Sequence, residues 1–306
     1  MPLTKLQFKP GINRETTSYT NEGGWFDCDK IRFRSGVPEK IGGWTKKTSN
    51  TFLGICRAMH HFVALDGTLF SGIGTNLKYY IEEGGAFNDV TPLRLTTSAG
   101  DVTFAATNGS AVITASDTDH GAIQGDFVTF SGAATLGGTI TASVLNREYE
   151  ITDIVNANSY KFTATATANS SDTGSGGGST VGKYQINVGL DTAVAGTGWG
   201  AGTWGRGTWG SASSLIAAGS TLRLWSHDNF GEDLLMNVRD GGIFYWDRSD
   251  SSSSFVRAVA LSTESSDAKT PTIAKQIMVS DRDRHVIAFG CDPEDAIGTQ
   301  DPLLIR

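Results

Sequence analysis

The sequence predicts an all-β fold, and three observations support this. Helical periodicity is nearly absent, whereas short alternating apolar runs bounded by Gly, Asn, Asp and Ser recur along the chain, which is typical of half-buried strands joined by tight turns. Glycine makes up about 12% of the 306 residues, against an average of roughly 7%, and this favours turns over helices. Hydrophobic residues account for 39% and aromatic residues for 9%, enough to build a core.

The first expected element lies in the polar amino-terminal segment. In IRFR, residues 31–34, apolar and basic side chains alternate, and a Ser-Gly turn follows at residues 35–36. This pattern predicts a solvated edge strand with one basic face. Two Gly-Gly-Trp units flank it and end at Trp25 and Trp44, which we take as candidate interface residues.

Two stretches on either side of the middle of the chain share a pattern. DGTLF at residues 66–70 and DGGIFY at 240–245 each predict a turn entering an apolar strand, and further strands are expected at 88–95 and 254–261. Weak self-similarity on a scale of about 40 residues is typical of four-stranded β-propeller blades. We therefore expect propeller-like blades, about five of them outside an inserted segment.

The clearest hairpin is expected at residues 102–114. Val102, Phe104 and Ala106 alternate on one side, and Asn-Gly at residues 108–109 predicts a type I′ turn, which needs two positive φ angles.

Further short strands follow this hairpin and end in a Gly- and Ser-rich run, residues 170–180, which we expect to be a flexible tether. Together they predict a small inserted β-barrel or sandwich. The expected strands and the turn between them lie at residues 127–130, 137–138, 149–151 and 160–166. The predicted domains are a propeller-like part at residues 1–95, an inserted β-barrel module at 96–186, and the continued propeller-like part at 187–306.

A tryptophan-glycine stretch opens the last predicted part. Trp199, Trp204 and Trp209 recur every five residues, a period of neither helix nor strand, so a loop is expected. Its rings either pack back on the core, form a subunit interface, or provide a platform for a glycan or a base. Trp199, Trp204, Arg206 and Trp209 are the candidate interface residues of this loop.

Charge and motifs favour a non-enzymatic protein that does not hold DNA. A formal net charge of −7 argues against a surface that neutralises many phosphates. The sequence has no G-x-S-x-G, GxxxxGK[ST], H-E-x-x-H or paired CxxC motif. The acidic pairs Asp27 with Asp29 and Glu148 with Glu150 leave glycoside hydrolysis as a weak alternative, because sequence proximity does not establish the carboxylate spacing that it needs.

Three further patterns carry minor alternatives. Asp281, Asp283 and His285 would share one face of a strand and leave a metal site open, although the expectation is no metal and no cofactor. Residues 226–228, Ser-His-Asp, resemble part of the Ser-x-Asp-x-Gly turn of sialidase-type propellers, with the glycine one position late. Three widely spaced cysteines fit neither a disulfide framework nor a zinc module, so buried, inert thiols are expected.

No apolar run approaches the roughly 18 residues of a membrane-spanning helix, and the first residues lack the apolar core of a secretory signal. We therefore expect a product made in the cytosol without membrane insertion. The chain stops at residues 303–306 inside an expected strand, so we expect a missing carboxy-terminal part or completion by another chain.

Three segments resemble virion proteins of short-tailed bacteriophages: FKPGINRETTSYTNEGGWFDCDKIRFRSGVPEKIGGW, TGWGAGTWGRGTWG and CDPEDAIGTQDPLLIR. The nearest group is the tail nozzle, or tail-stabilisation, protein of the tail tubular protein B type. The stretch GDFVTFSGAATLGGTITASVLNREYEITDIVNANSYKFTA is similar to a small β-barrel module of phage structural proteins.

That resemblance implies a structural protein of the virion tail. It implies a homo-oligomeric ring, a hexamer, of propeller subunits that extends the DNA-ejection channel below portal and adaptor and carries tail fibres or a plug, with DNA passing through without specific binding. The alternative from another class is a host-surface module in which the barrel or the tryptophan loop binds glycan.

Overall fold

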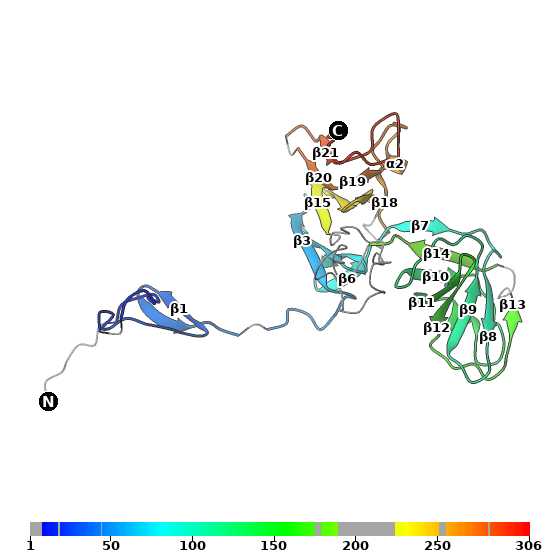
Figure 1. Ribbon diagram of the computed structural model, residues 1–306, viewed down its shortest axis with the longest axis horizontal. Coiled ribbons are helices and arrows are strands. Elements are labelled where there is room, and N and C mark those ends of the chain that lie inside the picture. Colours follow the sequence, from blue (N-terminus) through cyan, green and yellow to red (C-terminus); the bar gives the residue numbers. More distant parts are fainter. Residues whose placement is uncertain are drawn as a thin grey trace, which may run out of the picture. The chain divides into compact units, whose positions relative to one another are not determined.

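The computed structural model describes residues 8–17, 19–43, 45–174, 179–188, 224–250, 255–280 and 282–306. The described chain consists of strands and loops with two four-residue helices, which confirms the all-β fold class (Figure 1). It divides into two compact units, residues 1–49 and residues 50–306.

The unit of residues 1–49 is built on a two-stranded hairpin. β1 (Ile31–Arg34) pairs antiparallel with β2 (Val37–Lys40). Ser35 and Gly36 have φ angles of 50° and 80°, the two positive values of a type I′ turn. The apolar residues of β1 are half-buried and its arginines are exposed, so the predicted strand with one basic face is confirmed.

The first sheet of the unit 50–306 has four antiparallel strands in chain order. They are β3 (Cys56–Val63), β4 (Leu69–Thr75), β5 (Tyr79–Glu83) and β6 (Ala86–Asp89). The predicted turn before β4 is present, and its Asp66 Oδ1 accepts a hydrogen bond from the Thr68 backbone N–H at 2.8 Å.

The second sheet follows the order β15–β16–β17–β18, with β19 also paired to β17. Its strands are β15 (Trp225–Phe230), β16 (Asp233–Val238), β17 (Gly241–Trp246), β18 (Val259–Ala260) and β19 (Ile273–Ala274), and α2 (Leu261–Glu264) follows β18. The predicted turn before residue 241 is confirmed. Every residue from Leu234 to Val238 is buried, so β16 is covered on both faces.

A hairpin forms a third layer. β20 (Gln276–Val279) pairs with β21 (Val286–Phe289), and Ile305 makes a bridge to Phe289. The backbones of Arg306 and Ala288 exchange hydrogen bonds of 2.7 and 3.0 Å. The last described residues therefore run extended beside β21.

These layers pack face to face through two apolar clusters. Phe62 and Phe70 of the first sheet meet Met236 and Trp246 of the second. On the opposite side of the second sheet, Leu235 and other residues pack on Ile277 and Ala288 of the hairpin. The blade-like stacking is confirmed, but the described residues hold two such sheets and one hairpin rather than about five blades, partly because residues 1–49 form a separate unit.

The strands predicted at 88–95 and 254–261 are shorter than expected. β6 ends at Asp89 and β7 begins at Leu93. The Val90 N–H still donates to the Tyr79 carbonyl of β5 at 3.0 Å, but the Thr91 N–H turns to the Asp89 side chain and Pro92 has no N–H to donate. The Val90 carbonyl accepts a hydrogen bond from the Ala258 N–H at 3.0 Å. Residues 255–258 consequently lie against this connection, and only β18 of the second predicted strand forms.

The segment between the two sheets folds into one eight-stranded sheet with the order β13–β8–β9–β12–β11–β10–β14–β7. Its elements are β7 (Leu93–Thr96), β8 (Thr103–Ala106), β9 (Val112–Ser116), β10 (Phe127–Ser131), α1 (Ala142–Leu145), β11 (Glu148–Asn156), β12 (Ser159–Thr163), β13 (Thr173–Gly174) and β14 (Val181–Gln185). The predicted domain boundaries at 95/96 and 186/187 remain predictions.

This sheet curls around its own core without closing into a barrel. Phe104 of β8 and Phe130 of β10 stand four places apart in the strand order, yet their ring centroids are 5.0 Å apart. The strand order ends at β7 and β13, which do not pair with each other among the described residues. The predicted barrel is therefore an open, curled sheet; we call residues 93–185 the inserted module.

Two local predictions in the inserted module need correction. The β8–β9 hairpin is present, but Gly109 has a φ of 80° while Asn108 does not have a positive φ, so the turn is of type II character and not type I′. The Gly109 N–H donates to the Ala168 carbonyl at 2.7 Å, and this contact widens the loop. Residues 170–174 of the predicted tether pack on β8 through β13, because Asp172 exchanges backbone hydrogen bonds with Ala106.

No helix in the described part of the chain is long and apolar enough to cross a lipid bilayer.

Candidate functional site

Most of the predicted interface residues lie outside the described residues, and their interface role stays a prediction. They are Trp44, Trp199, Trp204, Arg206 and Trp209.

Trp25 is described, and it packs within the unit of residues 1–49. Its ring centroid lies 5.5 Å from that of Phe8 and 6.2 Å from that of Phe33 on β1. Trp25 also forms a parallel bridge with Ile12. These contacts make Trp25 the centre of a small aromatic cluster, and its interface role also stays a prediction.

Neither acidic pair faces a common cleft. Asp27 forms a 2.7 Å ion pair with Arg14, and both side chains are exposed, as is that of Asp29. Glu148 and Glu150 are two residues apart on β11, where Glu148 is half-buried among cations and Glu150 is exposed.

The residues that left a metal site open do not share a strand face. Asp281 lies outside the described residues, and Asp283 and His285 are exposed in the turn between β20 and β21. Arg284 has a φ of 52°, and its N–H donates to the Ser280 carbonyl at 2.7 Å, which fixes a turn in place of the expected strand. Among the described residues there is no group of three or more His, Cys, Asp or Glu side chains arranged to hold a metal.

Residues 226–228 lie on strand β15 and form no turn. The Ser226 hydroxyl accepts from the Ile277 N–H at 3.2 Å and donates to the Ile277 carbonyl at 3.0 Å. Asp228 Oδ2 accepts from the Val279 N–H at 2.8 Å. These side chains bind the backbone of β20 and so join the hairpin to the second sheet.

The thiols are free and only partly follow expectation. Cys291 is buried, Cys28 is half-buried and Cys56 is exposed. Burial raises the pKa of the Cys291 thiol, which keeps it protonated and unreactive. The expectation of buried thiols is therefore wrong for Cys56.

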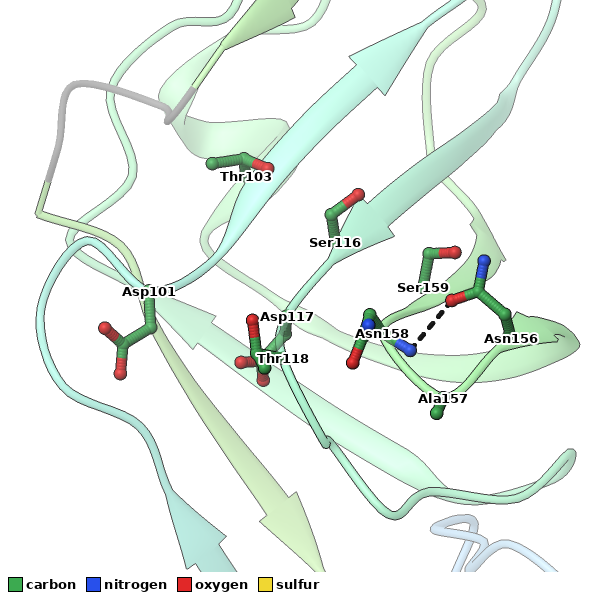
Figure 2. Close-up of a pocket in the computed structure, with 9 residues that line it drawn as sticks. All are labelled: Asp101, Thr103, Ser116, Asp117, Thr118, Asn156, Ala157, Asn158 and Ser159. Carbon is green, nitrogen blue, oxygen red and sulfur yellow. Dashed lines mark hydrogen bonds between the residues drawn. The ribbon is translucent and has the colours of Figure 1, made fainter.

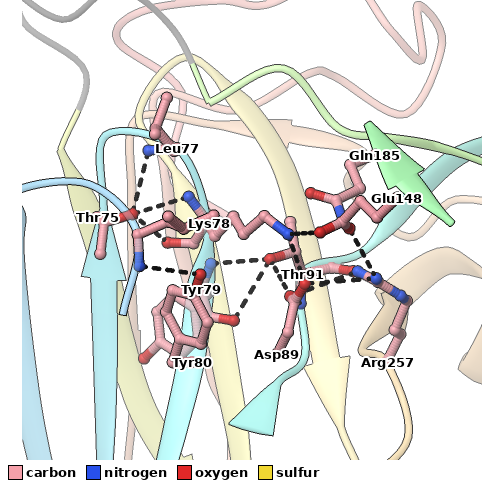
Figure 3. A network of polar contacts seen from close by, with 11 residues as sticks. Thr75, Leu77, Lys78, Tyr79, Tyr80, Asp89, Thr91, Glu148, Gln185 and Arg257 are labelled. Carbon is pink, nitrogen blue, oxygen red and sulfur yellow. Dashed lines mark hydrogen bonds and ion pairs between the residues drawn. The ribbon is translucent and has the colours of Figure 1, made fainter. Parts of the chain in front are cut away.

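A partly buried ion network joins the first sheet to the inserted module (Figure 3). The Lys78 side chain is 2% exposed, and its Nζ donates to Asp89 Oδ2 at 2.9 Å and to Glu148 Oε2. Arg257 lies 3.4 Å from Asp89 and 3.5 Å from Glu148, measured from its Nη2. We call Lys78, Asp89, Glu148 and Arg257 the junction network.

The junction network is closely balanced in charge, with two cations facing two carboxylates. Desolvation works against the charge of Asp89, but Lys78 and Arg257 outweigh it and lower the pKa of that carboxyl below its usual value of 3.8. The Lys78 ammonium also lies 4.6 Å from the ring centroid of Phe127 on β10. Sequence reasoning treated Glu148 as a possible hydrolase acid, whereas here it holds the module in place.

A second polar cluster joins β3 to β15. The Tyr79 hydroxyl lies 2.7 Å from His227 Nδ1, and the His227 and His60 ring centroids are 5.2 Å apart. His60 Nε2 also contacts Asn229 Oδ1. Burial first, and then the neighbouring His60, lower the pKa of His227 to about 4, so His227 is neutral at pH 7.

Apolar side chains remain exposed on both outer faces of the stacked layers. On the first sheet, Met59, Val63 and Leu69 point outward and are 53%, 58% and 70% exposed. On the hairpin, Met278 is 43% exposed and Ile305 is 60% exposed. We call these groups the β3–β4 face and the β20–β21 face.

The inserted module carries a polar pocket of about 520 Å³ at one end of its strands (Figure 2). Hydroxyl groups of Thr103, Ser116 and Ser159 line one side. Carboxylates of Asp101 and Asp117 and side-chain amides from the β11–β12 turn complete it. The described lining residues include neither a cation nor an aromatic ring, and sequence reasoning missed the pocket because its parts come from three separate stretches.

No protein-family model matches the chain, and no curated protein matches it. Among solved structures, the chain is similar to a phage phi92 endosialidase at 15% sequence identity and a TM-score of 0.22. The match covers 83% of this chain, which spans 36% of the length of the endosialidase chain.

Proposed function

We propose that this protein is a non-enzymatic structural component of a phage tail. In this proposal, copies of the chain form a ring-shaped nozzle that extends the DNA-ejection channel below portal and adaptor and supports fibres or a plug. The observation that carries the proposal is the pair of exposed apolar faces at opposite sides of the stacked layers, the β3–β4 face and the β20–β21 face.

The two faces favour contact between copies in one direction. Within the chain, apolar side chains join the first sheet to the second and the second sheet to the hairpin. The β3–β4 face of one copy can pack in the same way on the β20–β21 face of its neighbour. Two different faces that meet head to tail form a heterologous interface, and such an interface gives a ring when the rotation closes. A stack that ended in water would leave these apolar side chains exposed.

Charge and sequence resemblance support the same proposal. The formal net charge of −7 suits a conduit through which a polyanion slides, because basic linings hold DNA through counterion release. The amino-terminal, tryptophan-glycine and carboxy-terminal segments resemble tail-nozzle proteins, whose rings have six subunits. We therefore propose a virion-tail location and a six-fold ring.

A mixing experiment tests the head-to-tail contact. Val63→Glu places a charge on the β3–β4 face, and Met278→Glu places one on the β20–β21 face. Each variant alone should be monomeric in sedimentation velocity, and an equimolar mixture should form dimers and nothing larger, because each dimer retains one intact contact and two blocked faces. Val155→Glu, an exposed valine on β11, is the matched control and should assemble like the unchanged chain.

Two results would refute the contact. Assembly of either face variant into rings would show that its face is not used, and a mixture that stays monomeric would exclude head-to-tail pairing. Rotational symmetry in electron-microscope class averages of virions, with the protein located on them, tests the nozzle assignment separately.

A further inference from the structure

We infer that the polar pocket of the inserted module binds a neutral carbohydrate. This inference does not depend on ring assembly, because the pocket lies wholly within one copy of the module.

The first support is a row of hydroxyls in register on three neighbouring strands. Thr103 on β8 pairs with Ser116 on β9, and Ser116 pairs with Ser159 on β12. Directly paired residues on one side of a sheet project to the same face, so the three hydroxyls form a line about 5 Å apart. Their neighbours in sequence, Phe104, Ala115 and Tyr160, point into the core, which leaves the hydroxyls outward. A ligand with hydroxyls at similar intervals can bond to the whole row.

The second support is a buried carboxylate at the end of that row. Asp117, one residue beyond β9, is only 5% exposed and still lines the pocket (Figure 2). Its Oδ2 accepts a 2.6 Å hydrogen bond from the Tyr184 hydroxyl, which lies 2.8 Å from the Tyr160 hydroxyl. Among the described residues, its second oxygen has no side-chain or backbone donor. Asp117 is thus held in one orientation with a strong acceptor left for a ligand hydroxyl.

The third support is the order of the two asparagines beside the row, of which Asn156 on β11 pairs with Ser159 on β12. Asn156 Oδ1 accepts from the Asn158 N–H at 2.8 Å, and Asn158 Oδ1 accepts from the Asp119 N–H at 3.0 Å. These bonds fix both amide groups through their oxygens, so that their NH₂ groups serve as donors. A site whose polar groups are already held in place loses less entropy when a ligand binds.

The lining chemistry selects the ligand class. Two carboxylates without a lining cation disfavour phosphates, sulfates and acidic sugars. The scarcity of apolar side chains disfavours lipids and flat aromatic ligands, while hydroxyls, amides and carboxylates together match the donors and acceptors of an uncharged sugar. The pocket volume lies within the ordinary range for small-molecule sites.

Calorimetric titration of the full chain tests the inference. The probes are four neutral tetrasaccharides, of glucose with α linkage, glucose with β linkage, mannose and N-acetylglucosamine, and tetragalacturonic acid as the anionic comparison. We expect at least one neutral probe to saturate with a Kd of about 0.1–1 mM. Asp117→Asn should weaken that binding about tenfold, and Ser116→Ala about threefold.

Controls separate recognition from folding. Thr114→Val alters a hydroxyl on β9 two residues from Ser116 but outside the pocket, so it should leave the Kd unchanged. Ser116 is exposed, so its replacement tests binding even if Asp117→Asn weakens the fold. The inference is overturned if no neutral probe saturates by about 10 mM, if tetragalacturonic acid binds more tightly, or if Ser116→Ala and Thr114→Val have equal effects.

Discussion

Replacing Lys78 with methionine should loosen the inserted module from the first sheet. The substitution removes the ammonium but keeps an apolar side chain of similar length at a position only 2% exposed. Asp89 and Glu148 would then face each other with Arg257 alone, at 3.4 and 3.5 Å. Removing one partner from a fully buried ion pair costs about 3–5 kcal/mol.

The expected cost here is smaller than for a fully buried pair. The Asp89 and Glu148 side chains retain 23% and 30% exposure, and Arg257 offsets part of their charge. We therefore expect Lys78→Met to lower the free energy of unfolding by about 2–3 kcal/mol. Adding Glu148→Gln should recover about 1 kcal/mol of that loss, because Arg257 would then face one carboxylate instead of two.

Urea unfolding with amide hydrogen exchange is the assay. A chain with several modules need not unfold in one step, so exchange is followed at Tyr79 in the first sheet and Val128 in the module. Lys161→Met is the matched control, because Lys161 and its partner Asp153 are 40% and 55% exposed, and its loss should cost at most about 0.5 kcal/mol. Equal effects of the two lysine substitutions would refute the role assigned to the junction network.

Three further predictions concern acid stability and packing. The pKa of Asp89 is lower in the folded chain than its usual 3.8. The stability that ionised Asp89 contributes is therefore complete above pH 3.8 and is lost as the pH falls through the folded pKa. Asp89→Asn should reduce the pH dependence of the urea unfolding midpoint below pH 4. Folding lowers the pKa of His227 from 6.5 to about 4, so the unfolded state takes up the proton first as the pH falls. The free energy of unfolding should therefore decline by up to about 3 kcal/mol between pH 6.5 and pH 4. His227→Gln should remove this pH dependence in urea titrations. A Cβ at Gly74 would lie 2.3 Å from Trp225 Cδ1, so Gly74→Ala should cost about 1–3 kcal/mol in thermal unfolding, whereas Gly42→Ala, with open space around it, should be nearly neutral.

Alternation along the chain was enough to predict most strands of this fold. In the inserted module, Val102, Phe104 and Ala106 are buried as expected, because alternate side chains of a strand point to the same face however the sheet packs. The turn at 35–36 was predictable because it depends only on the hairpin that contains it, and no distant described segment bonds to its backbone. The turn at 108–109 was not, since Ala168 and Ser171, 59 and 63 residues further along the chain, accept hydrogen bonds from its backbone.

The polar sites were beyond sequence reasoning for the same reason. Lys78 meets partners 11 and 70 positions away, and Arg257 reaches Asp89 across 168 positions. A single sequence shows each of these residues as an ordinary surface charge. The row formed by Thr103, Ser116 and Ser159 likewise depends on strand register, which alternation alone does not determine.

The pairing of β7 with β14 brings the entry and exit of the inserted module together. Thr96 lies opposite Lys183 and Leu95 opposite Tyr184, so the chain leaves the module one strand spacing from where it entered. A two-residue connection could bridge those positions. The module could therefore be exchanged, duplicated or removed without changing the path of the chain through the surrounding sheets, provided that the replacement supplied carboxylates to pair with Lys78 and Arg257.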